Sequence, residues 1–309
     1  MLKQLEFIKM HGLGNDFVIV DFRDSAINAP NDGGLARAAK HICDRKAGIG
    51  CDQFIVLTPS KDSAAAAHLQ FFNPDGSQAA ACGNGTRCVA ALLFDRMDQK
   101  TNKITLTTLR GQLHAMDHRQ ANGDIAVDMG APIFNWQQIP LAYNPDSLIH
   151  LPIHLPDGED QGLGAVGVGF GNPHAVFMVE DAEKIDIEKI APALETHPLF
   201  PQRANIGFVS ARGNNIFRLI VWERGAGRTL ACGSGASAAS VAVTRRGLVK
   251  AADRSNVMIS FIVDGSLRYP QHDGSPSYLK TCWRADDQHI ELSGATAHSF
   301  SGHLDLNFN

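Results

Sequence analysis

Two stretches of this 309-residue chain resemble each other closely enough to decide its fold. The first is Phe71-Phe-Asn-Pro-Asp-Gly-Ser-Gln-Ala-Ala-Ala-Cys82-Gly-Asn-Gly85, and the second is Val221-Trp-Glu-Arg-Gly-Ala-Gly-Arg-Thr-Leu-Ala-Cys232-Gly-Ser-Gly235. In each, an apolar β-prone run leads into a polar, glycine-containing turn, and Ala-Cys-Gly-x-Gly follows. The two cysteines stand about half a chain length apart. A repeat with this period indicates duplication of a domain rather than a solenoid of short units.

The run after each cysteine predicts a helix, over residues 84–97 in the first copy and 234–246 in the second. Apolar residues recur near helical spacing and cover most sides, which is typical of a buried helix. Arg96, Arg245 and Arg246 fall at the C-terminal ends, where the helix dipole favours cations. Each half of the chain is therefore expected to consist of strands around a central helix.

The rest of the chain is rich in short alternating or β-branched segments, which predict strands at 104–108, 125–129, 175–179, 217–221 and 257–263. Two further helices are predicted at 35–44 and 185–194. Prolines crowd residues 132–156, which places a domain switch near residue 130. The predicted fold class is α+β, with two pseudo-symmetric domains, each a mostly antiparallel sheet or barrel wrapped around a central helix. The first covers 1–129, with 295–309 returning to it, and the second covers 130–294.

Composition excludes several classes of function. A net charge of −4 offers no basic face for nucleic acid, and no apolar run is long enough to cross a membrane. The first ten residues lack the apolar core of a secretory signal, so a cytoplasmic protein is expected. The six cysteines form no C-x-x-C pair and the histidines show no zinc spacing, so no metal is expected. Gly162–Gly167 fits G-x-G-x-x-G but leads into a strand-like run, so no dinucleotide cofactor is expected.

A cysteine at the start of a buried helix has a specific chemical use. Unpaired backbone N–H groups and the dipole favour the thiolate there, so the pKa of the thiol is expected to fall. The same N–H groups can hold a carboxylate. Two such helix ends facing each other would put a sulfur on each side of the carbon next to that carboxylate, which suits removal of an α-proton on one face and its return on the other. The alternative is that both cysteines only pack beneath the helices.

At these residues the chain resembles the diaminopimelate epimerase family. Further motifs carry the resemblance in the same order along the chain: Lys9-Met-His-Gly-Leu-Gly-Asn15-Asp-Phe17, Gly48-Ile-Gly-Cys-Asp-Gln53, Gly171-Asn-Pro-His-Ala-Val176, Ala204-Asn-Ile-Gly-Phe208 and Trp222-Glu-Arg-Gly-Ala-Gly227. The resemblance implies a small-molecule substrate with two ammonium–carboxylate ends, a homodimer, and no pyridoxal phosphate, nicotinamide or metal.

The resemblance also implies roles for individual residues. Cys82 and Cys232 would be the two acid/base groups, and His174 and Glu223 would tune their pKa values. The substrate would be held by Asn15, Gln53, Asn73, Gly83, Asn84, Asn172, Asn205, Glu223, Arg224, Gly233 and Ser234. An arginine can bind a carboxylate through two hydrogen bonds, and an asparagine amide offers both a donor and an acceptor to a zwitterion.

Some positions depart from the family pattern. Cys51 adds a thiol to the second motif, Arg228 stands where an acidic residue is common, and Phe300 replaces a tyrosine involved in dimer contacts. Two alternatives to diaminopimelate epimerisation stay open: an epimerase or racemase of another amino acid on the same fold, and a thiol redox protein in which Cys82 and Cys232 form a reversible disulfide.

Overall fold

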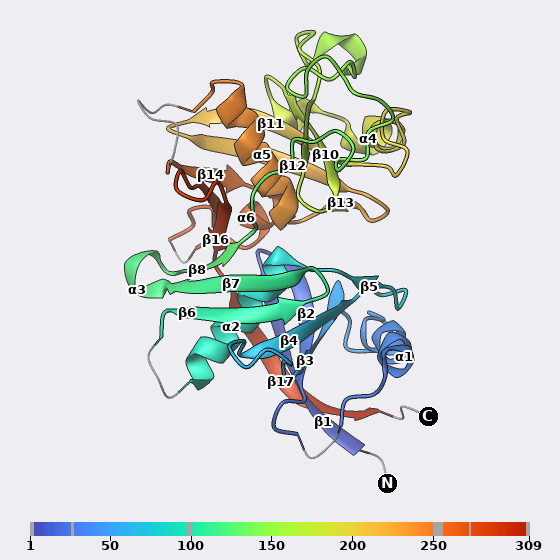
Figure 1. Ribbon diagram of the computed structural model, residues 1–309, viewed down its shortest axis with the longest axis vertical. Helices are drawn as coiled ribbons and strands as arrows, with labels where there is room; N and C mark the ends of the chain where they lie inside the picture. The colour runs from blue at the N-terminus through green and yellow to red at the C-terminus, as the bar shows by residue number, and fades with distance from the viewer. Residues whose placement is uncertain (1–2, 26–27, 98–100, 250–255, 272, 307–309) are drawn as a thin grey trace. The chain divides into compact units, whose positions relative to one another are not determined.

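A computed structural model describes residues 3–25, 28–97, 101–249, 256–271 and 273–306, and its chain divides into two compact units (Figure 1). Unit 1 comprises residues 1–127 and 294–309, and unit 2 comprises residues 128–293. The division falls beside the domain switch that the prolines predict near residue 130. The last three residues of the predicted returning segment, 307–309, lie outside the described residues.

Unit 1 holds the strands of the first half together with the last strand of the chain. They are β1 (Lys3–Gly12), β2 (Asn15–Asp21), β3 (Gln53–Thr58), β4 (Ala67–Phe72), β5 (Gln78–Ala79), β6 (Lys103–Thr108), β7 (Gly111–His118), β8 (Asp124–Asp128) and β17 (Ala297–Leu306). Its helices are α1 (Asp32–Ile42), α2 (Gly83–Arg96) and the short α3 (Arg119–Asn122). β17 pairs antiparallel with β1, the first strand of the chain.

Unit 2 repeats the order of the strands β1 to β8 and of the helices α1 and α2. Its strands are β9 (Val166–Gly169), β10 (Pro173–Met178), β11 (Asn205–Gly213), β12 (Ile216–Glu223), β13 (Gly227–Thr229), β14 (Met258–Ile262), β15 (Leu279–Trp283) and β16 (Ile290–Gly294). Its helices are α4 (Ile187–Glu195), α5 (Gly233–Arg245) and α6 (Asp264–Arg268), with short 3-10 turns η1 (Pro156–Gly158) and η2 (Ala182–Lys184).

The strand pairing is the same in both units. In unit 1, β1–β2 is antiparallel, β2–β3 parallel, β3–β4 and β4–β5 antiparallel, β4–β6 parallel, and β6–β7 and β7–β8 antiparallel. In unit 2, β9 to β16 follow the identical series of directions. The duplication predicted from the two cysteine segments is therefore confirmed at the level of topology, and so is the mostly antiparallel α+β fold.

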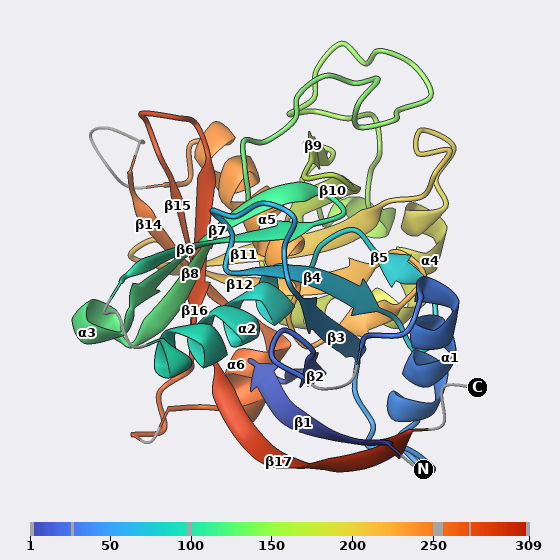
Figure 2. The ribbon, with the colours of Figure 1, turned by 60° about the horizontal axis from the view of Figure 1, so that its bottom comes forward.

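Each unit wraps its strands around one helix (Figures 1 and 2). In α2, residues 84–91 are all buried, and in α5 only Ser234 and Arg245 are not. Both helices begin one residue before their predicted starts and end one residue before their predicted ends. Burial on nearly every side explains why these segments are rich in alanine and glycine, since small residues let strands approach a helix closely.

A second helix covers the other face of the strands in each unit. α1 packs Leu35, Ala38 and Ile42 against Val20 and Phe54 of the sheet. In unit 2, α4 packs its Ile187, Ala191 and Leu194 into an equivalent core with residues of β10, β11 and β12. Each of these helices also makes the crossover that joins two parallel strands, β2 to β3 and β10 to β11.

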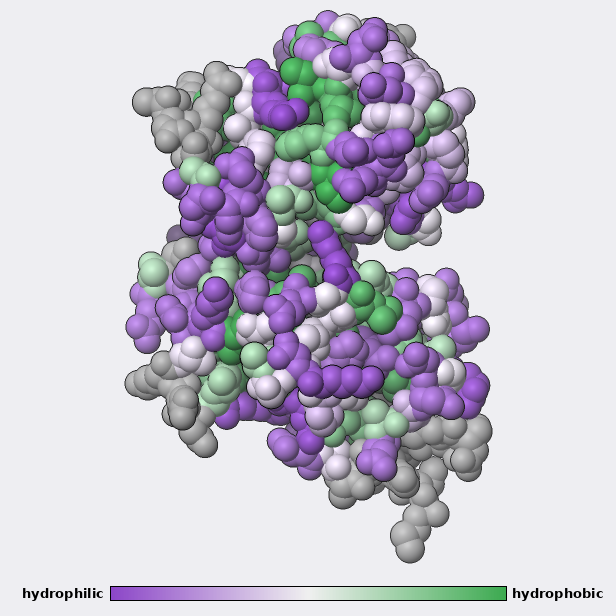
Figure 3. All heavy atoms as spheres, in the orientation of Figure 1, coloured by the Kyte–Doolittle hydropathy of each residue, from purple (hydrophilic) through white to green (hydrophobic). Residues whose placement is uncertain are grey.

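Hydrophilic side chains dominate the face drawn in Figure 3, with smaller hydrophobic areas between them. Among the helices of the described residues, none has the length and apolar character needed to cross a membrane.

Candidate active site

Both predicted catalytic cysteines occupy the N-cap of a buried helix. Cys82 has extended backbone angles, and its Sγ accepts a hydrogen bond from the Gly85 N–H at 3.4 Å. Cys232 has the same conformation before α5, and its Sγ accepts from the Gly235 N–H at 3.3 Å. A sulfur therefore takes the place that a serine or aspartate oxygen usually fills at a helix start. This confirms the predicted placement of a cysteine just before each central helix.

The predicted binding residues lie at matching strand ends in the two units. In unit 1, Asn15 and Gln53 are the first residues of β2 and β3, and Asn73 directly follows β4. In unit 2, Asn172 directly precedes β10, Asn205 is the first residue of β11, and Glu223 is the last residue of β12. Because the pairing of the strands is the same, each of these residues has a topological counterpart in the other unit.

In unit 1 the predicted residues are joined by side-chain hydrogen bonds. Asn84 Nδ2 donates to Asn15 Oδ1 at 3.2 Å, and Gln53 Nε2 donates to Asn73 Oδ1 at 2.9 Å. Gly83 and Asn84 are the first two residues of α2, directly after Cys82. Asn15 owes its position to the tight turn between β1 and β2, where Leu13 and Gly14 both have positive φ, as a two-residue hairpin of this hand requires.

Unit 2 joins its predicted residues in a comparable network. Asn172 Nδ2 donates to Ser234 Oγ at 3.4 Å, and the Ser234 hydroxyl lies 3.5 Å from Cys232 Sγ. Asn205 Oδ1 accepts from the backbone N–H of Arg224 at 2.8 Å. The Arg224 guanidinium donates to the backbone oxygen of Gln202. The structure thus brings Asn172, Ser234 and Cys232 into one connected group, with Gly233 and Ser234 opening α5.

The thiol of Cys232 does not follow the expected pKa shift. The helix start was expected to lower it, whereas burial, followed by the negative charge of Glu223, raises the pKa of Cys232 well above its ordinary value. The Gly235 N–H and the Ser234 hydroxyl favour the thiolate but do not outweigh burial. The prediction of a lowered pKa is therefore wrong for Cys232, which holds its proton at neutral pH in this state.

The negative charge of Glu223 is, after burial, a cause of the raised pKa of Cys232. Its carboxylate also accepts a hydrogen bond from the Thr229 hydroxyl at 2.6 Å. Arg228, which the sequence places near Cys232, instead donates to Asp264 Oδ2 at 2.7 Å.

His174 contacts amides. Its Nε2 lies 3.0 Å from Asn172 Oδ1 and 3.5 Å from Asn205 Nδ2. Burial, with a smaller effect of the Arg224 charge, lowers the pKa of His174 to about 3, so the ring is neutral at physiological pH. A neutral ring can donate from Nε2 to Asn172 Oδ1, and this hydrogen bond joins a predicted tuning residue to a predicted binding residue.

Two acidic residues that the sequence did not single out support the site. Glu195 at the end of α4 accepts from Trp222 Nε1 at 2.7 Å and from the Gly225 N–H at 3.0 Å, on either side of Glu223 and Arg224. Asp52 accepts from Asn15 Nδ2 at 2.8 Å. The position of Asp52 inside the Gly48–Gln53 motif was the only sequence signal for it, and nothing in the sequence pointed to Glu195.

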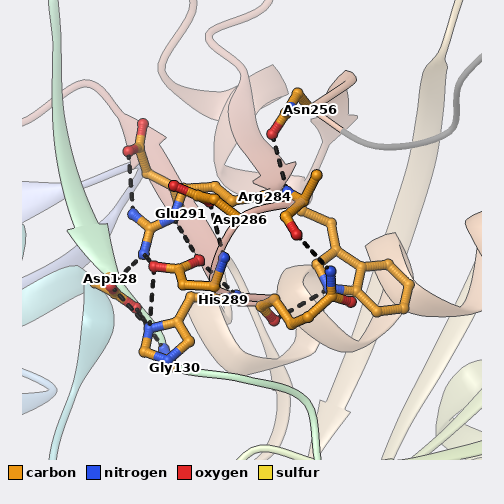
Figure 4. Close-up of polar contacts among 11 residues, drawn as sticks. Asp128, Gly130, Asn256, Arg284, Asp286, His289 and Glu291 are labelled. Atoms are coloured by element: carbon orange, nitrogen blue, oxygen red, sulfur yellow. Dashed lines mark hydrogen bonds and ion pairs between the residues drawn. The ribbon is translucent and has the colours of Figure 1, made fainter.

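One group of residues in unit 2 has the composition of a metal site. Ligand atoms of Asp128, Asp287 and His289 lie within 4.8 Å of one another. Figure 4 shows Asp128 and His289 beside Arg284. The Arg284 guanidinium, however, contacts both carboxylates, at 2.5 Å each, and His289 Nδ1 lies 2.9 Å from Asp128 Oδ1. The cation that balances this cluster is therefore an arginine.

Comparison with known proteins identifies the family. The family model described as diaminopimelate epimerase matches residues 7–135 and 166–260. A diaminopimelate epimerase of Rhodospirillum centenum is 41% identical over 298 residues, covering 96% of this chain and 91% of that protein. One from Acidiphilium cryptum is 44% identical over 302 residues, covering 97% and 96%.

Among solved structures, a predicted epimerase from Pseudomonas aeruginosa has the same fold, with a TM-score of 0.68 at 17% identity over 98% of this chain and all of that one. The extent of the family match and the identity to its members over nearly their whole length lead to one conclusion: the chain belongs to the diaminopimelate epimerase family.

Proposed function

We propose that this protein interconverts LL- and meso-2,6-diaminopimelate by moving one α-proton between Cys82 and Cys232 without a cofactor. The observation that carries the mechanism is the pair of N-cap cysteines at equivalent places in a duplicated fold. Membership of the family supports the substrate. The activity belongs to lysine and peptidoglycan-precursor biosynthesis.

In the proposed step, one cysteine enters as thiolate and the other as thiol. The thiolate removes the proton from the α-carbon, the electron pair of the broken C–H bond stays on that carbon, and the thiol delivers its own proton to the opposite face. The charge state is restored with the roles exchanged, so the reverse reaction uses the same groups. The raised pKa of Cys232 supports its role as the thiol that starts one direction.

Charge that develops beside the α-carbon needs donors that are already in place. Backbone N–H groups at Gly83 and Asn84 in unit 1, and at Gly233 and Ser234 in unit 2, begin the two central helices. The first N–H groups of a helix point out of its N-terminal end, where the dipole directs positive potential toward a bound carboxylate. Preorganised donors of this kind are among the largest contributors to catalysis of proton abstraction.

Recognition of the second, unreacting end is assigned to Asn73, Asn172, Asn205, Glu223 and Arg224. Amides and a guanidinium together match a group that carries both an ammonium and a carboxylate. An enzyme for an amino acid with one such end would need no second polar cluster. The alternative, a racemase or epimerase of another amino acid on this fold, predicts turnover of that amino acid instead.

The test is incorporation of solvent deuterium into the α-carbon in heavy water, followed by mass spectrometry. Wild-type protein should label LL- and meso-diaminopimelate and leave histidine, proline and lanthionine unlabelled. Cys82→Ser and Cys232→Ser should lose activity, whereas Cys282→Ser, which changes a half-buried thiol on β15, should keep it. Absence of labelling in diaminopimelate would refute the function.

The same experiment under full reduction decides the redox alternative. A protein that works only through a reversible Cys82–Cys232 disulfide has no use for either thiol in proton exchange. Loss of labelling in reduced Cys232→Ser therefore contradicts that role.

We further propose a cytoplasmic homodimer. Phe300 on β17 is 48% exposed and packs edge-on against Phe7, with ring centroids 5.9 Å apart, so it offers an aromatic surface to a second copy. Sedimentation at several concentrations tests this, with Phe300→Ser expected to shift the protein toward the monomer.

A further inference from the structure

Three hydrogen bonds in unit 1 link a buried arginine to a carboxylate through two of the predicted binding residues. Arg87 Nη2 donates to Asn84 Oδ1 at 2.7 Å. Asn84 Nδ2 donates to Asn15 Oδ1 at 3.2 Å, and Asn15 Nδ2 donates to Asp52 Oδ2 at 2.8 Å. The two asparagines thus stand in the middle of a chain whose ends carry opposite charges.

The ends of this chain determine how both amides are turned. A guanidinium has only donors and an ionised carboxylate has only acceptors. Asn84 must therefore present its oxygen to Arg87, which leaves its nitrogen for Asn15. Asn15 must accept with its oxygen and donate with its nitrogen to Asp52. Any other orientation of either amide sets two donors or two acceptors against each other.

Burial of the charged Arg87 side chain costs free energy. Its side chain is fully buried, and its Nε and Nη1 atoms find no hydrogen-bond partner in the described part of the chain. Burial lowers the pKa of Arg87, with the charge of Asp124 acting in the opposite direction. An apolar side chain of similar size would usually stabilise such a position more. Stability alone would favour an apolar side chain at this position, so the hydrogen bond to Asn84 is the reason for an arginine there.

Asp52 is held firmly at the other end. Besides Asn15, it accepts from the Asp16 N–H at 3.0 Å and from Arg45 Nη2 at 2.7 Å. The Arg45 side chain is 58% exposed and pairs with Asp16 as well, so it belongs to the surface side of this group. Asp52 is the member that turns toward Asn15.

We infer that Asp52 and Arg87 are positioning residues, which fix the end of the Asn15 and Asn84 amides that faces the substrate. The inference rests on the proposed function, since it assigns both asparagines to substrate binding. An amide N–H attracts a carboxylate and an amide oxygen repels it, so a reversed amide loses one hydrogen bond and adds a repulsion. The orientation of these two amides thus affects the affinity for substrate, and Asp52 and Arg87 set that orientation.

The kinetic test uses Asp52→Asn, which keeps the shape of the side chain but removes its acceptor-only character. A hydrogen bond to a charged group is worth enough that KM for diaminopimelate should rise about tenfold or more, while kcat changes much less. Asp52→Glu, which keeps the charge, should recover most of the affinity. Arg45→Gln removes the exposed ion pairs of Arg45 with Asp16 and Asp52 but keeps the Asp52 carboxylate and its hydrogen bond from Asn15, so it should leave KM within about twofold of the wild-type value.

A second measurement does not depend on activity. Asn84 reaches Asp52 through Asn15, so the side-chain amide resonance of Asn84 in ¹⁵N-labelled protein should shift or split in Asp52→Asn and stay unchanged in Arg45→Gln. Wild-type protein that fails to label diaminopimelate would refute the proposed function, and the amide resonances would still decide the orientation. An unshifted Asn84 resonance in Asp52→Asn, or a KM rise in Arg45→Gln equal to that of Asp52→Asn, would overturn the inference.

Discussion

The third residue of each central helix is a glycine, and the two glycines should respond differently to alanine. A Cβ at Gly235 would lie 3.1 Å from Val221 Cγ2 and 3.2 Å from Cys232 Sγ. A Cβ at Gly85 would instead lie 2.8 Å from Ile55 Cδ1 and 3.1 Å from an atom of the Phe71 ring. Neither glycine has a positive φ, so alanine suits the backbone at both positions. The two variants therefore add the same methyl group, once against the sulfur of Cys232 and once against the core.

The magnitudes follow from packing. Alanine gains up to about 1 kcal/mol over glycine inside a helix, whereas an extra methyl group in a packed core costs about 1–3 kcal/mol. Gly85→Ala, with the closer contacts to rigid side chains, should lose about 2 kcal/mol of unfolding free energy, and Gly235→Ala about 1 kcal/mol. Displacement of Cys232 Sγ by several tenths of an ångström should lower kcat about tenfold, since a shift of about 1 Å can cost a hundredfold.

The assay combines urea unfolding with initial rates of deuterium incorporation for both variants. We expect Gly85→Ala to be the less stable protein and Gly235→Ala the slower enzyme. A Gly235→Ala variant with wild-type kcat, beside a Gly85→Ala variant that has lost most of it, would refute the view that Cys232 Sγ is the group that this packing holds in place.

Three further outcomes can be checked. The pKa of His174 is about 3 in the folded protein and about 6.5 in the unfolded chain, so its contribution to the unfolding free energy is complete above about pH 6.5 and falls with pH by up to about 1.4 kcal/mol per unit. Urea unfolding at pH 5 and 7 should therefore show a smaller loss of unfolding free energy at pH 5 in His174→Gln than in the wild type. An equal loss in the two proteins would contradict the neutral buried ring. Glu223→Gln should lower the pKa of Cys232, because the carboxylate charge raises it. The part of the pH profile of kcat/KM that reports the titration of this thiol should then move to lower pH. A profile that does not move would show that Glu223 does not act on the thiol. Prolonged treatment with EDTA should leave the exchange rate unchanged, because Arg284 already balances the acidic cluster around Asp128; a loss restored by added divalent ions would contradict this.

Local pattern was enough to predict the elements that carry the chemistry. The central helices were predictable because burial on nearly all sides selects small, mostly apolar residues, as at residues 235–244, which make nearly three turns. Their starts were predictable to within one residue because in both copies the cysteine is the N-cap and the glycines after it lie in the first turn. The matching order of strands in the two halves was predictable from the sequence repeat alone, without knowing which strands pair.

The properties that depend on tertiary contacts were not predictable. Cys232 has the same local sequence signal as Cys82, yet burial and the charge of Glu223 decide the direction of its pKa shift. Glu195 accepts a hydrogen bond from Trp222, and Asp52 accepts one from Asn15. The two residues of each pair lie far apart in the sequence, so no local pattern predicts that they meet. The parallel pairing of β2 with β3 and of β10 with β11 likewise results from crossovers through α1 and α4.

The most direct test of the two-thiol account follows solvent label at early conversion. Starting from LL-diaminopimelate in heavy water, the meso product should carry deuterium at the inverted carbon while the recovered substrate stays unlabelled, because one sulfur removes the proton and another, already exchanged with solvent, supplies the new one. Equal labelling of substrate and product from the first turnovers would show that a single group serves both faces, and would contradict the account.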